Sequence, residues 1–597
     1  MSNDKQAEGD RVETTRRHRN RATSAYLSGV SVMTFAGISL LGLAAHATTY
    51  TITSDGSDGK CSLQMAVAEI NGDVVHNPVC GPNGPSGNDV IKLGIDLWVS
   101  SGITLKKSMT IQSASSSFSQ NIVNSGSFSS TFLVNHIATS SINITFQDLN
   151  LFGQGGESTG ALDALGNGGG DTVTFLRCVV ASYTTNAING LAINFTIKDS
   201  YLHDNQGYGS GGGAVFLEGP APCGGCALDV ENSTFASNYA DNGSAIRGQT
   251  VGISKIVNST ISENDASITG AINWGNDLRL AHAGDPPLGR LDIIGSTIFD
   301  NVSSTNSAGV YIQANADSNG NPTTTYPVVN INGSIIGDNF SYGSPASLFD
   351  YVGKVTSLNN SLLSQPGGIV NASGSGKYTG SGNILNVATG VDYSMYDWGG
   401  IQPDNPPTHA LLPGSRAIDA LSSGSFVNPS VDERHFPRGF DAIAGGNTFD
   451  IGAHENDPNF EAETLYVTAS NVAAANRPAV SVTGFSFGKG INFKATKVGD
   501  SVTFRVPVPK PGSHMAIRVQ TTSASGTYKI EDSSFDQSLN TIVASQDMYS
   551  STTKILNLNY NGTFYDNDDT DITFTVVGKN SKSTGYQLFL DFINLTP

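Results

Sequence analysis

Charged residues are scarce in this chain of 597 residues, where Asp, Glu, Lys and Arg together make up 14%. The chain instead has 68 glycines and abundant Ser, Thr and Asn. This composition does not suit a helical enzyme and favours many short strands joined by tight turns. The length alone would predict several domains, although a repeat protein can reach this size as one stack.

Positive charge is also in short supply. The net charge is −19, and the first 47 residues carry six Lys or Arg against four Asp or Glu, so the remainder carries −21. A chain this acidic is a poor partner for nucleic acid and for polyanionic substrates, unless a local basic patch overrides the net field.

No apolar run is long enough to anchor the chain in a membrane. The longest, from Tyr26 to Leu43, follows four arginines and precedes Ala45-His46-Ala47, whose small-x-small form suits signal peptidase. Residues 1–47 are therefore predicted to be a signal peptide. We expect the general secretory route, because His18 and Arg19 follow the arginine pair where twin-arginine signals have apolar residues. The protein is then secreted or displayed on the surface of a bacterial cell.

Only five cysteines are present. In an exported chain we expect disulfides between Cys61 and Cys80 and between Cys223 and Cys226. A metal held by the second pair would need two further ligands, and none is evident nearby. Cys178 is predicted to be a buried free thiol.

One short phrase recurs between residues 197 and 339. Examples are Lys-Asp-Ser-Tyr-Leu-His-Asp-Asn at 198–205 and Glu-Asn-Ser-Thr-Phe-Ala-Ser-Asn at 231–238. Including looser copies, the central position falls at residues 149, 178, 200, 233, 259, 296, 334 and 361. A repeat of this length with apolar columns in register predicts stacked parallel coils about 4.8 Å apart.

Two apolar columns in the repeat lie five residues apart, so one straight strand cannot point both inward. The sequence therefore predicts a bend between them, at the turn-forming residues Asp199, Asn232, Asn258, Gly295 and Gly333. A recurrent asparagine closes the phrase and is predicted to form a ladder of side-chain amides rather than an active site. The ladder residues are Asn205, Asn238, Asn264, Asn301 and Asn339.

A short amphipathic helix is predicted at 62–70, where Ser62 can cap its start and the helix can cover the first coil. The segment Cys61-Ser-Leu-Gln-Met-Ala-Val resembles the Cys-Ser-Leu-Arg-Glu-Ala-Ile segment that opens many exported bacterial β-helix proteins, with departures at Gln64 and Met65.

Residues 408–455 are similar to the closing region of the bacterial "choice-of-anchor Q" β-helix proteins. Three segments match in order, at 408–419, 432–438 and 450–455, with Arg416, Glu433 and His435 replacing the usual Pro, Gln and Gly. The resemblance implies the last coils and the C-terminal cap of a right-handed parallel β-helix in a family whose members mostly lack a known activity. Cap hydrogen bonds and ion pairs are expected from His409, Asp419, Asp432, Arg434 and Asp450.

Alternating strands after residue 461 predict an antiparallel β-sandwich. The phrase from Gly585 to Ile593 resembles the last strands of galactose-binding-like jelly rolls, which implies a carbohydrate-binding module. Clustered carboxylates in the loop before the penultimate strand could hold Ca²⁺, although acidic loops are more often only solvated. The candidate ligands are Asp566, Asp568, Asp569 and Asp571.

The strand after each asparagine is expected to present an outward row. Aromatic rings can stack on sugar faces and amides can bind hydroxyls, so the row suits a polysaccharide, unless it is only a solvated face. The predicted contacts are Phe216, Arg247, Asn273 and Tyr311, with Glu218, Trp274, Gln249 and Gln313 beside them. In a lyase, Arg247 would neutralise or deprotonate a uronate and Tyr311 would act as the acid.

An acidic row precedes the asparagines at Glu263, Asp300 and Asp338. Like charges one coil apart repel, which a Ca²⁺ ion, a shared proton or splaying into water would relieve. Glu263 and Asp300 are also spaced like the carboxyl pair of a retaining glycosidase, although such a pair needs a cleft.

The sequence thus predicts an all-β, pectate-lyase-like, right-handed parallel β-helix with an N-terminal helical cap at residues 48–460 and a jelly-roll β-sandwich at 461–597. The predicted function is polysaccharide binding, with cleavage by a lyase or hydrolase as a hypothesis. The alternative is a non-catalytic surface or adhesion protein. We expect a monomer whose partner is a polysaccharide, with no nucleic acid and no membrane span after signal removal, and Ca²⁺ as the one candidate cofactor.

Overall fold

The structure is a computed structural model. The described residues are 47–81, 84–115, 120–126, 130–138, 140–154, 160–168, 170–207, 211–219, 226–250, 252–275, 289–304, 307–314, 326–342, 349–370, 379–396, 406–412, 414–422, 430–435, 438, 448–455, 460–462, 465, 467–485, 489–507, 512–533, 539–564 and 569–596.

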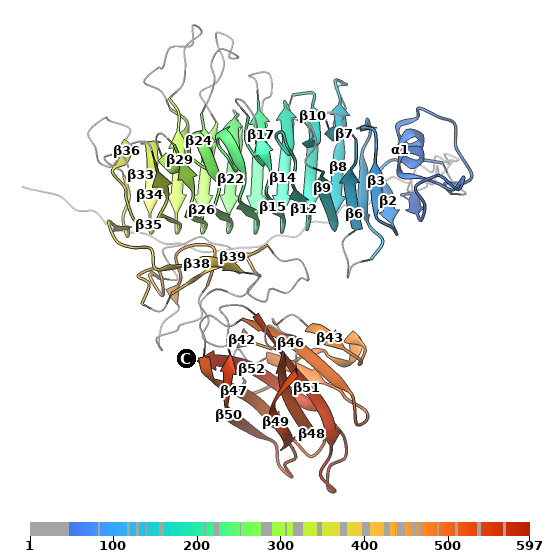
Figure 1. Cartoon of the computed structure of the whole chain (residues 1–597), viewed down its shortest axis with the longest axis vertical. Coiled ribbons are helices and arrows are strands. Elements are labelled where there is room, and N and C mark those ends of the chain that lie inside the picture. The colour runs from blue at the N-terminus through green and yellow to red at the C-terminus, as the bar shows by residue number, and fades with distance from the viewer. Residues whose placement is uncertain are drawn as a thin grey trace, which may run out of the picture. The chain divides into compact units, whose positions relative to one another are not determined.

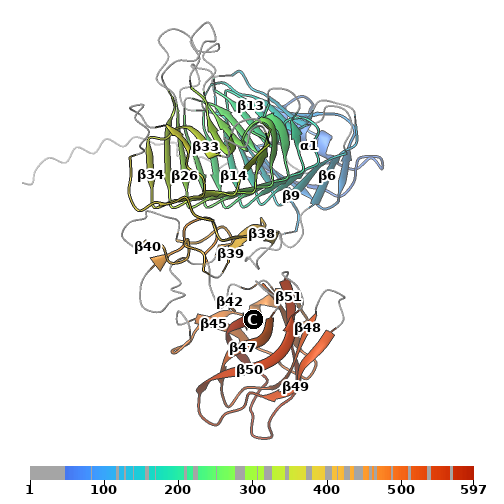
Figure 2. The ribbon, with the colours of Figure 1, turned by 60° about the vertical axis from the view of Figure 1, so that its left-hand side comes forward.

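Parallel strands dominate the first part of the chain and stack into long sheets (Figures 1 and 2). Sheet A contains β1 (Thr49–Ile52), β2 (Asp89–Leu93), β5 (Met109–Ser113), β8 (Asn143–Gln147), β11 (Thr172–Leu176), β14 (Asn194–Lys198), β18 (Leu228–Glu231), β22 (Ile253–Val257), β26 (Arg290–Ile294), β30 (Val328–Asn332) and β34 (Ser357–Asn359). Sheet B contains β3 (Leu97–Val99), β6 (Gln120–Asn124), β9 (Leu149–Gly153), β12 (Val179–Ala181), β15 (Tyr201–His203), β19 (Thr234–Ala236), β23 (Thr260–Ser262), β27 (Thr297–Phe299), β31 (Ile335–Gly337), β35 (Leu362–Leu363) and β37 (Ile384–Leu385).

Two further parallel sheets complete each coil. Sheet C contains β4 (Ile103–Leu105), β7 (Ser130–Asn135), β10 (Gly160–Leu165), β13 (Ile188–Leu191), β17 (Val215–Glu218), β21 (Ile246–Gln249), β25 (Ile272–Trp274), β29 (Ser307–Ile312), β33 (Phe349–Lys354) and β36 (Gly368–Val370). The narrow sheet D contains β16 (Gln206–Gly207), β20 (Tyr239–Asn242), β24 (Asp265–Thr269), β28 (Val302–Ser303) and β32 (Phe340–Ser341). Successive coils contribute neighbouring strands to the same sheets, so the chain is a right-handed parallel β-helix, as predicted.

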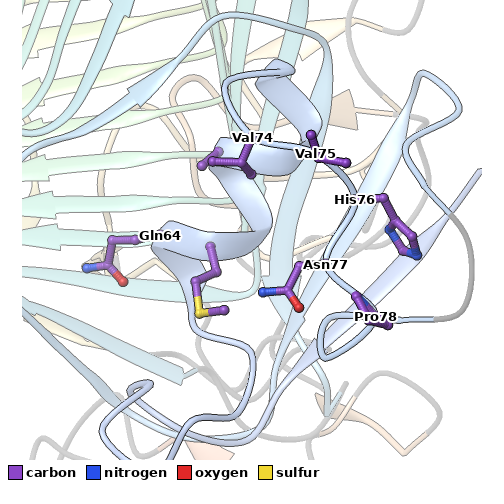
Figure 3. A pocket seen from close by; sticks show the side chains of 8 residues that line it. Gln64, Val74, Val75, His76, Asn77 and Pro78 are labelled. Atoms are coloured by element: carbon purple, nitrogen blue, oxygen red, sulfur yellow. The ribbon is translucent and has the colours of Figure 1, made fainter.

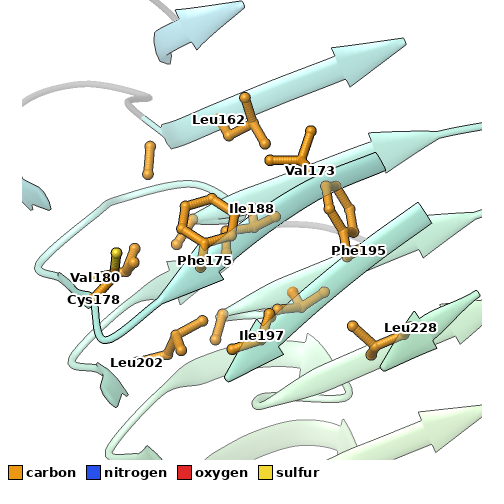
Figure 4. Close-up of a cluster of buried hydrophobic side chains, with 14 of the residues drawn as sticks. Leu162, Val173, Phe175, Cys178, Val180, Ile188, Phe195, Ile197, Leu202 and Leu228 are labelled. Carbon is orange, nitrogen blue, oxygen red and sulfur yellow. The ribbon is translucent and has the colours of Figure 1, made fainter. Parts of the chain in front are cut away.

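Strand alternation explains the core of the β-helix. In β14 the burial pattern alternates, and Phe195 and Ile197 point inward with at most 1% exposed surface. Two columns continue in neighbouring coils, because Phe175 is in register with Ile197 and Leu228 with Phe195, and these side chains lie inside the helix (Figure 4). Each apolar column is thus buried against the columns of the facing sheets, and this burial stabilises every coil.

The predicted bends lie between sheets A and B. Asp199, Asn232 and Asn258 have left-handed backbones with φ of 51°, 49° and 54°, and Gly295 and Gly333 take the same conformation. Asn and Gly tolerate this region better than other residues, which explains their recurrence. The bend turns the chain once per coil, so both apolar columns of the repeat point inward, as predicted.

The asparagine column forms the predicted ladder at the corner between sheets B and D. Asn238 Nδ2 donates to Asn264 Oδ1 at 2.9 Å, and Asn264 Nδ2 donates to Asn301 Oδ1 at 2.9 Å. A second ladder runs through the serines of the repeat, in which the backbone N–H of Ser200 donates to Ser233 Oγ at 3.1 Å and that of Ser233 to Ser259 Oγ at 3.1 Å. Both columns are fully buried and satisfy backbone groups, so they are scaffold.

Helix α1 (Leu63–Asn71) covers the first coil, as predicted. Ser62 caps it, with Ser62 Oγ accepting from the N–H of Met65 at 3.3 Å, and Leu63, Ala66 and Ile70 are buried in the β-helix core. The disulfide between Cys61 and Cys80 closes the same segment. Cys178 is a buried free thiol, as expected. Cys226 is buried and disulfide-bonded, whereas Cys223 lies outside the described residues.

The described residues between 387 and 455, which we call the clasp, lie along the side of the β-helix rather than over its last coil. Their strands are β38 (Val391–Tyr396), β39 (Thr408–Leu411), β40 (Leu421–Ser422) and β41 (Thr448–Phe449). His409 Nε2 lies 2.7 Å from Ser262 Oγ on β23, and the Ala453 N–H donates to Thr297 Oγ1 on β27 at 3.0 Å. The expected position of the C-terminal cap is therefore wrong, because Val391, Leu411 and Ile451 of the clasp pack against Phe299, Ile335 and Leu362 of sheet B.

The expected cap hydrogen bonds and ion pairs are present within the clasp. Arg434 Nε donates to Asp432 Oδ2 at 2.8 Å, and the N–H of Asp419 donates to Asp450 Oδ1 at 2.7 Å. Arg438 Nη2 donates to Asn258 Oδ1 at 2.5 Å, which ties the clasp to a bend of the β-helix. All five side chains are involved in fixing the clasp, and none of them is arranged around an open site.

The C-terminal strands form an antiparallel β-sandwich, as predicted. One sheet contains β42 (Phe460–Glu461), β44 (Ala479–Ser481), β45 (Lys489–Phe493), β47 (Gly512–Thr521), β50 (Lys554–Phe564) and β52 (Leu588–Thr596), and the other contains β43 (Val467–Ser470), β46 (Ser501–Pro507), β48 (Thr527–Ser533), β49 (Leu539–Asp547) and β51 (Asp569–Gly578). A short 3₁₀ turn, η2, spans Ala474–Asn476. The β-sandwich has a core of its own, formed by inward residues such as Ile517, Val519 and Phe574. In the described part of the chain, no helix is long and apolar enough to cross a membrane.

Candidate functional site

The outer face of sheet C carries the predicted row in register. Phe216 pairs with Arg247, Arg247 with Asn273, and Asn273 with Tyr311 on β17, β21, β25 and β29. The inward neighbours Val215 and Ile246 are fully buried, so strand alternation directs the row outward. The register predicted from the sequence is therefore confirmed.

Arg247 and Phe216 form the centre of this row. The guanidinium carbon of Arg247 lies 5.2 Å from the centroid of the Phe216 ring, within range of a cation–π interaction. Both side chains are partly exposed. The structure thus places a cation, Arg247, against an aromatic ring, Phe216, and both side chains are partly exposed on the outer face of sheet C.

Tyr311 lies two strands beyond Arg247, about 10 Å away along the stack. Burial raises the pKa of Tyr311. Because Arg247 leans toward Phe216, on the side away from Tyr311, the two side chains are not brought together as a base and an acid. Their arrangement favours two separate contacts along a polymer.

Two of the residues predicted to contact a polysaccharide, Trp274 and Asn273, contact other residues of the protein instead. Trp274 is fully buried and stacks beneath Gly248, so the expectation that it binds substrate is wrong. It lies two residues after the inward Ile272, and strand alternation turns it inward as well. Asn273 points outward but is 4% exposed, and its Nδ2 donates to Thr269 Oγ1 at 2.7 Å.

A second outward row lies two residues further along the strands. Glu218 pairs with Gln249; Glu218 is partly exposed, Gln249 is buried and Gln313 is exposed. The sequence analysis missed Lys354, which lies two residues beyond the partner of Tyr311, and whose Nζ is 5.8 Å from the ring of Tyr326. Extending the register by one coil would have found Lys354. Sheet C therefore carries a second cation, which lies near a ring from the segment before β30.

The acidic row lies at the corner between sheets B and D, where Glu263, Asp300 and Asp338 have φ of 58°, 51° and 54°. Burial, together with the neighbouring Glu263 and Asp338, raises the pKa of Asp300 to about 6. Asp338 Oδ2 accepts from Thr389 Oγ1 of the clasp at 2.5 Å. A Ca²⁺ ion, a shared proton or exposure to water was expected to relieve the repulsion between these carboxylates. Exposure to water fits only Glu263, whose side chain is exposed.

Tyr393 of β38 lies beside this acidic row. Its ring is 5.0 Å from that of Phe299, and burial and the carboxylates of Asp338 and Asp300 raise its pKa. In the part of the chain that the structure describes, no group of three or more His, Cys, Asp or Glu side chains could hold a metal ion. The geometry therefore places a half-buried carboxyl next to an exposed one and a phenol.

The predicted calcium loop lies only partly within the described residues. Asp566 and Asp568 fall outside them, and the side chain of Asp569 is not described either. Asp571 forms an ion pair with Arg505, with Oδ1 3.3 Å from Nε. The calcium site stays a prediction that the loss of thermal stability in a chelator would test.

The N-terminal cap has a hollow of about 490 Å³, lined by Met65, Val74, His76 and their neighbours (Figure 3). Its polar groups bind one another, since His76 Nδ1 lies 2.6 Å from Glu69 Oε1, which accepts from the Tyr50 hydroxyl at 3.2 Å. Gln64 and Asn77 are the other polar residues of the lining, and an amide side chain is neither an acid, a base nor a nucleophile for chemistry on a substrate.

No family model matches the chain, and no curated protein matches it either. Among solved structures, it is similar to a Paenibacillus xanthan lyase, with 24% identity and a TM-score of 0.21, over 25% of this chain and 14% of the lyase. The enzymatically active domain of tailspike protein 4 from bacteriophage CBA120 matches over 90% of this chain and 67% of that one, with 12% identity and a TM-score of 0.21.

The C-terminal part is similar to a CBM36 carbohydrate-binding module solved with calcium and xylotriose. This match has 13% identity and a TM-score of 0.16, and it covers 23% of this chain and 98% of the module. Similarities this remote assign no activity. The strand register alone establishes the class: a parallel β-helix followed by an antiparallel β-sandwich.

Proposed function

We propose that this protein binds a polysaccharide along the outer face of sheet C. The observation that supports this most directly is the Arg247–Phe216 pair, in which a cation and a ring are held together on an open sheet face. Tyr311 and the Lys354–Tyr326 pair continue the same face over the following coils. A chain lying along the stack would meet a ring or a cation at several successive sugars.

The test is affinity electrophoresis of the full-length protein in gels that contain either a uronate polysaccharide or a neutral one. We expect retardation of the wild type, and Arg247→Ala should weaken it about tenfold through loss of a charge-assisted contact. Lys255→Ala is the matched control, because Lys255 is an exposed cation on β22 of sheet A. Equal retardation of both variants and the wild type would contradict the proposal, and no retardation in any gel would favour an adhesion protein.

A hydrolase at the acidic row is the second candidate function. A carboxyl whose pKa lies near 6 can act as a general acid around neutral pH, and Glu263 occupies the equivalent turn one coil away. We expect Asp300→Asn to abolish any release of reducing ends. Asp204→Asn is the control, because Asp204 takes the same turn position on an earlier coil. Unsaturated products that persist in Asp300→Asn would indicate a lyase elsewhere.

The β-sandwich is proposed to supply a separate sugar contact. On its six-stranded sheet, Arg518 lies over the ring of Phe592, with 5.9 Å between guanidinium carbon and centroid. The neighbouring edge strand β50 exposes Asn557 and Asn559. Calorimetric titration of Asn559→Ala with neutral oligosaccharides tests this contact, which should weaken if the amides bind sugar hydroxyls.

A further inference from the structure

A stripe of apolar side chains runs along the outside of sheet B in the first coils. Trp98 pairs with Val123, Val123 with Phe152, Phe152 with Ala181, and Ala181 with His203. We call these five residues the aromatic stripe. They follow one another along β3, β6, β9, β12 and β15, which lie in succession along the helix (Figure 1).

Strand alternation directs the stripe outward. The neighbours of Trp98, Leu97 and Val99, are buried, whereas Trp98 itself is 62% exposed. Phe152 and His203 are partly exposed, and the His203 ring stacks on Tyr201 with 4.1 Å between centroids. Ala181, which lies between Phe152 and His203, is fully buried, so the accessible side chains of the stripe are those of Trp98, Val123, Phe152 and His203.

The rings of the stripe recur on every second coil. Trp98, Phe152 and His203 are each separated by one small apolar residue, so their backbones lie about 10 Å apart, twice the strand spacing. This separation is comparable with the length of two pyranose units in an extended β-linked chain. A straight polymer laid along the stripe would thus place every second sugar over a ring.

An amide row lies beside the rings. Asn150 Nδ2 donates to Asn121 Oδ1 at 3.1 Å, and Asn121 Nδ2 donates to Asp96 Oδ2 at 3.1 Å. Asp96, Asn121 and Asn150 lie two residues before Trp98, Val123 and Phe152 respectively, within reach of hydroxyls at the edge of a stacked sugar. Rings that stack and amides that bind hydroxyls are the two chemistries that a sugar polymer needs.

The charges around the stripe indicate a neutral partner. Trp98, Val123, Phe152 and Ala181 carry no charge, and the nearby bend pairs Arg177 with Asp148, with Nε 2.6 Å from Oδ1. The whole chain is strongly acidic. A polyanion would meet no free cation on the stripe and an unfavourable net field.

The clasp explains why the stripe ends at His203. In the next coils the clasp covers the same face, beginning with His435, whose Nε2 lies 2.9 Å from Asp199 Oδ1. Sheet B therefore has a face closed by the chain itself on its later coils and an open one on its early coils.

From these observations we propose that the aromatic stripe is a binding surface for a neutral, extended β-linked polysaccharide. This surface is distinct from the Arg247 face on sheet C, and the proposal does not depend on that face. The polymer would lie parallel to the helix axis, with sugar rings stacked on Trp98 and Phe152 and hydroxyls bound by the amide row.

The test measures how much of the full-length protein is depleted from solution by microcrystalline cellulose, insoluble chitin or insoluble mannan. At least one polymer should retain the wild type, and Trp98→Ala should weaken retention about tenfold. Val123→Lys keeps both rings but inserts a charge between them and should weaken retention as well. Tyr342→Ala, which removes an aromatic side chain that is 79% exposed outside the stripe, should bind like the wild type.

Thermal unfolding of each variant separates binding from folding, and Trp98→Ala and Val123→Lys should unfold with the wild type because both side chains lie on the surface. Wild-type protein that no neutral polymer retains would overturn the proposal. Retention unchanged by Trp98→Ala and Val123→Lys, or lost equally with Tyr342→Ala, would also overturn it. A Trp98-dependent change in sedimentation coefficient, without loss of retention, would assign the stripe to contact between protein copies instead.

Discussion

Replacing Glu433 by Gln should remove the contribution of this one carboxyl to the pH dependence of clasp attachment. Glu433 is fully buried under the clasp, where Oε1 accepts from Thr234 Oγ1 at 2.8 Å and from the N–H of Thr260 at 3.2 Å, and Oε2 meets the Thr260 hydroxyl. Burial raises its pKa from 4.5 to about 8, although the hydroxyls and the N–H partly offset the shift. The carboxyl is therefore protonated at neutral pH when the clasp is docked.

The magnitude follows from the shift. The docked state keeps the proton while the undocked state releases it above its ordinary pKa, so docking is strongest below pH 4.5 and weakens as pH rises toward 8. Each pH unit in this window costs about 1.4 kcal/mol, and the whole window costs about 5 kcal/mol. Glutamine resembles the protonated acid and does not titrate. Near pH 4.5 the variant should match the wild type to within about 1 kcal/mol, and at pH 8 its clasp should be more stable.

Hydrogen exchange followed by mass spectrometry measures the stability of clasp docking at the contact itself. Peptides covering 255–262 and 430–435 report both sides of the contact, with exchange rates corrected for their intrinsic pH dependence. Other titrating groups, such as Asp350 and His454, are present in both proteins, so the difference between variant and wild type isolates Glu433. A difference between variant and wild type that is the same at pH 4.5 and pH 8 would refute the reasoning.

Two further predictions concern the scaffold. Asn264→Ala should lower the free energy of unfolding by about 3 kcal/mol in a chemical denaturation experiment, because Asn264 Nδ2 donates to Phe235 O and Asn301 Oδ1 and its Oδ1 accepts from Asn238; a loss below about 1 kcal/mol would show that the ladder is not a stabilising element. Gly248→Ala should lower the melting temperature measured by calorimetry, because its new Cβ would lie within 2.5 Å of three carbons of the buried Trp274 ring. Gly248→Ala combined with Trp274→Leu should recover much of that loss, and no recovery would contradict the steric explanation.

The β-helix could be predicted because its determinants repeat. The bends at Asn232 and Asn258 and the ladder through Asn264 return once per coil, so aligning the repeat superimposed residues that are stacked in space. The clasp could not be placed this way, because the bond between His435 and Asp199 joins residues 236 positions apart and has no periodic signal. Its internal hydrogen bonds were predicted, but its docking face was not.

In the candidate site too, the features that follow the repeat could be predicted and the individual side-chain contacts could not. The register placed Phe216 and Arg247 in one row correctly, because both follow the repeat. It could not show that Asn273 would be bound to Thr269, which depends on a local side-chain contact. The inward direction of Trp274 followed from alternation with Ile272, and composition alone had favoured a surface role for an aromatic residue. Phe152, Ala181 and His203 of the aromatic stripe lie three residues after the centre of the repeated phrase, whereas Trp98 and Val123 precede its first copy, so only the strand pairing reveals the whole stripe.

The clasp also sets an order on folding. Its bonds reach back by 147 to 236 residues along the chain, to Ser262, Thr234 and Asp199. Contacts this distant in sequence form late, because the loop that they close is entropically costly until the intervening coils have stacked. Until then, Thr260, Thr297 and Phe299 face solvent on an open sheet. A chain that stops before residue 387 should therefore stack its coils yet leave this face exposed, as an aggregation-prone intermediate during synthesis.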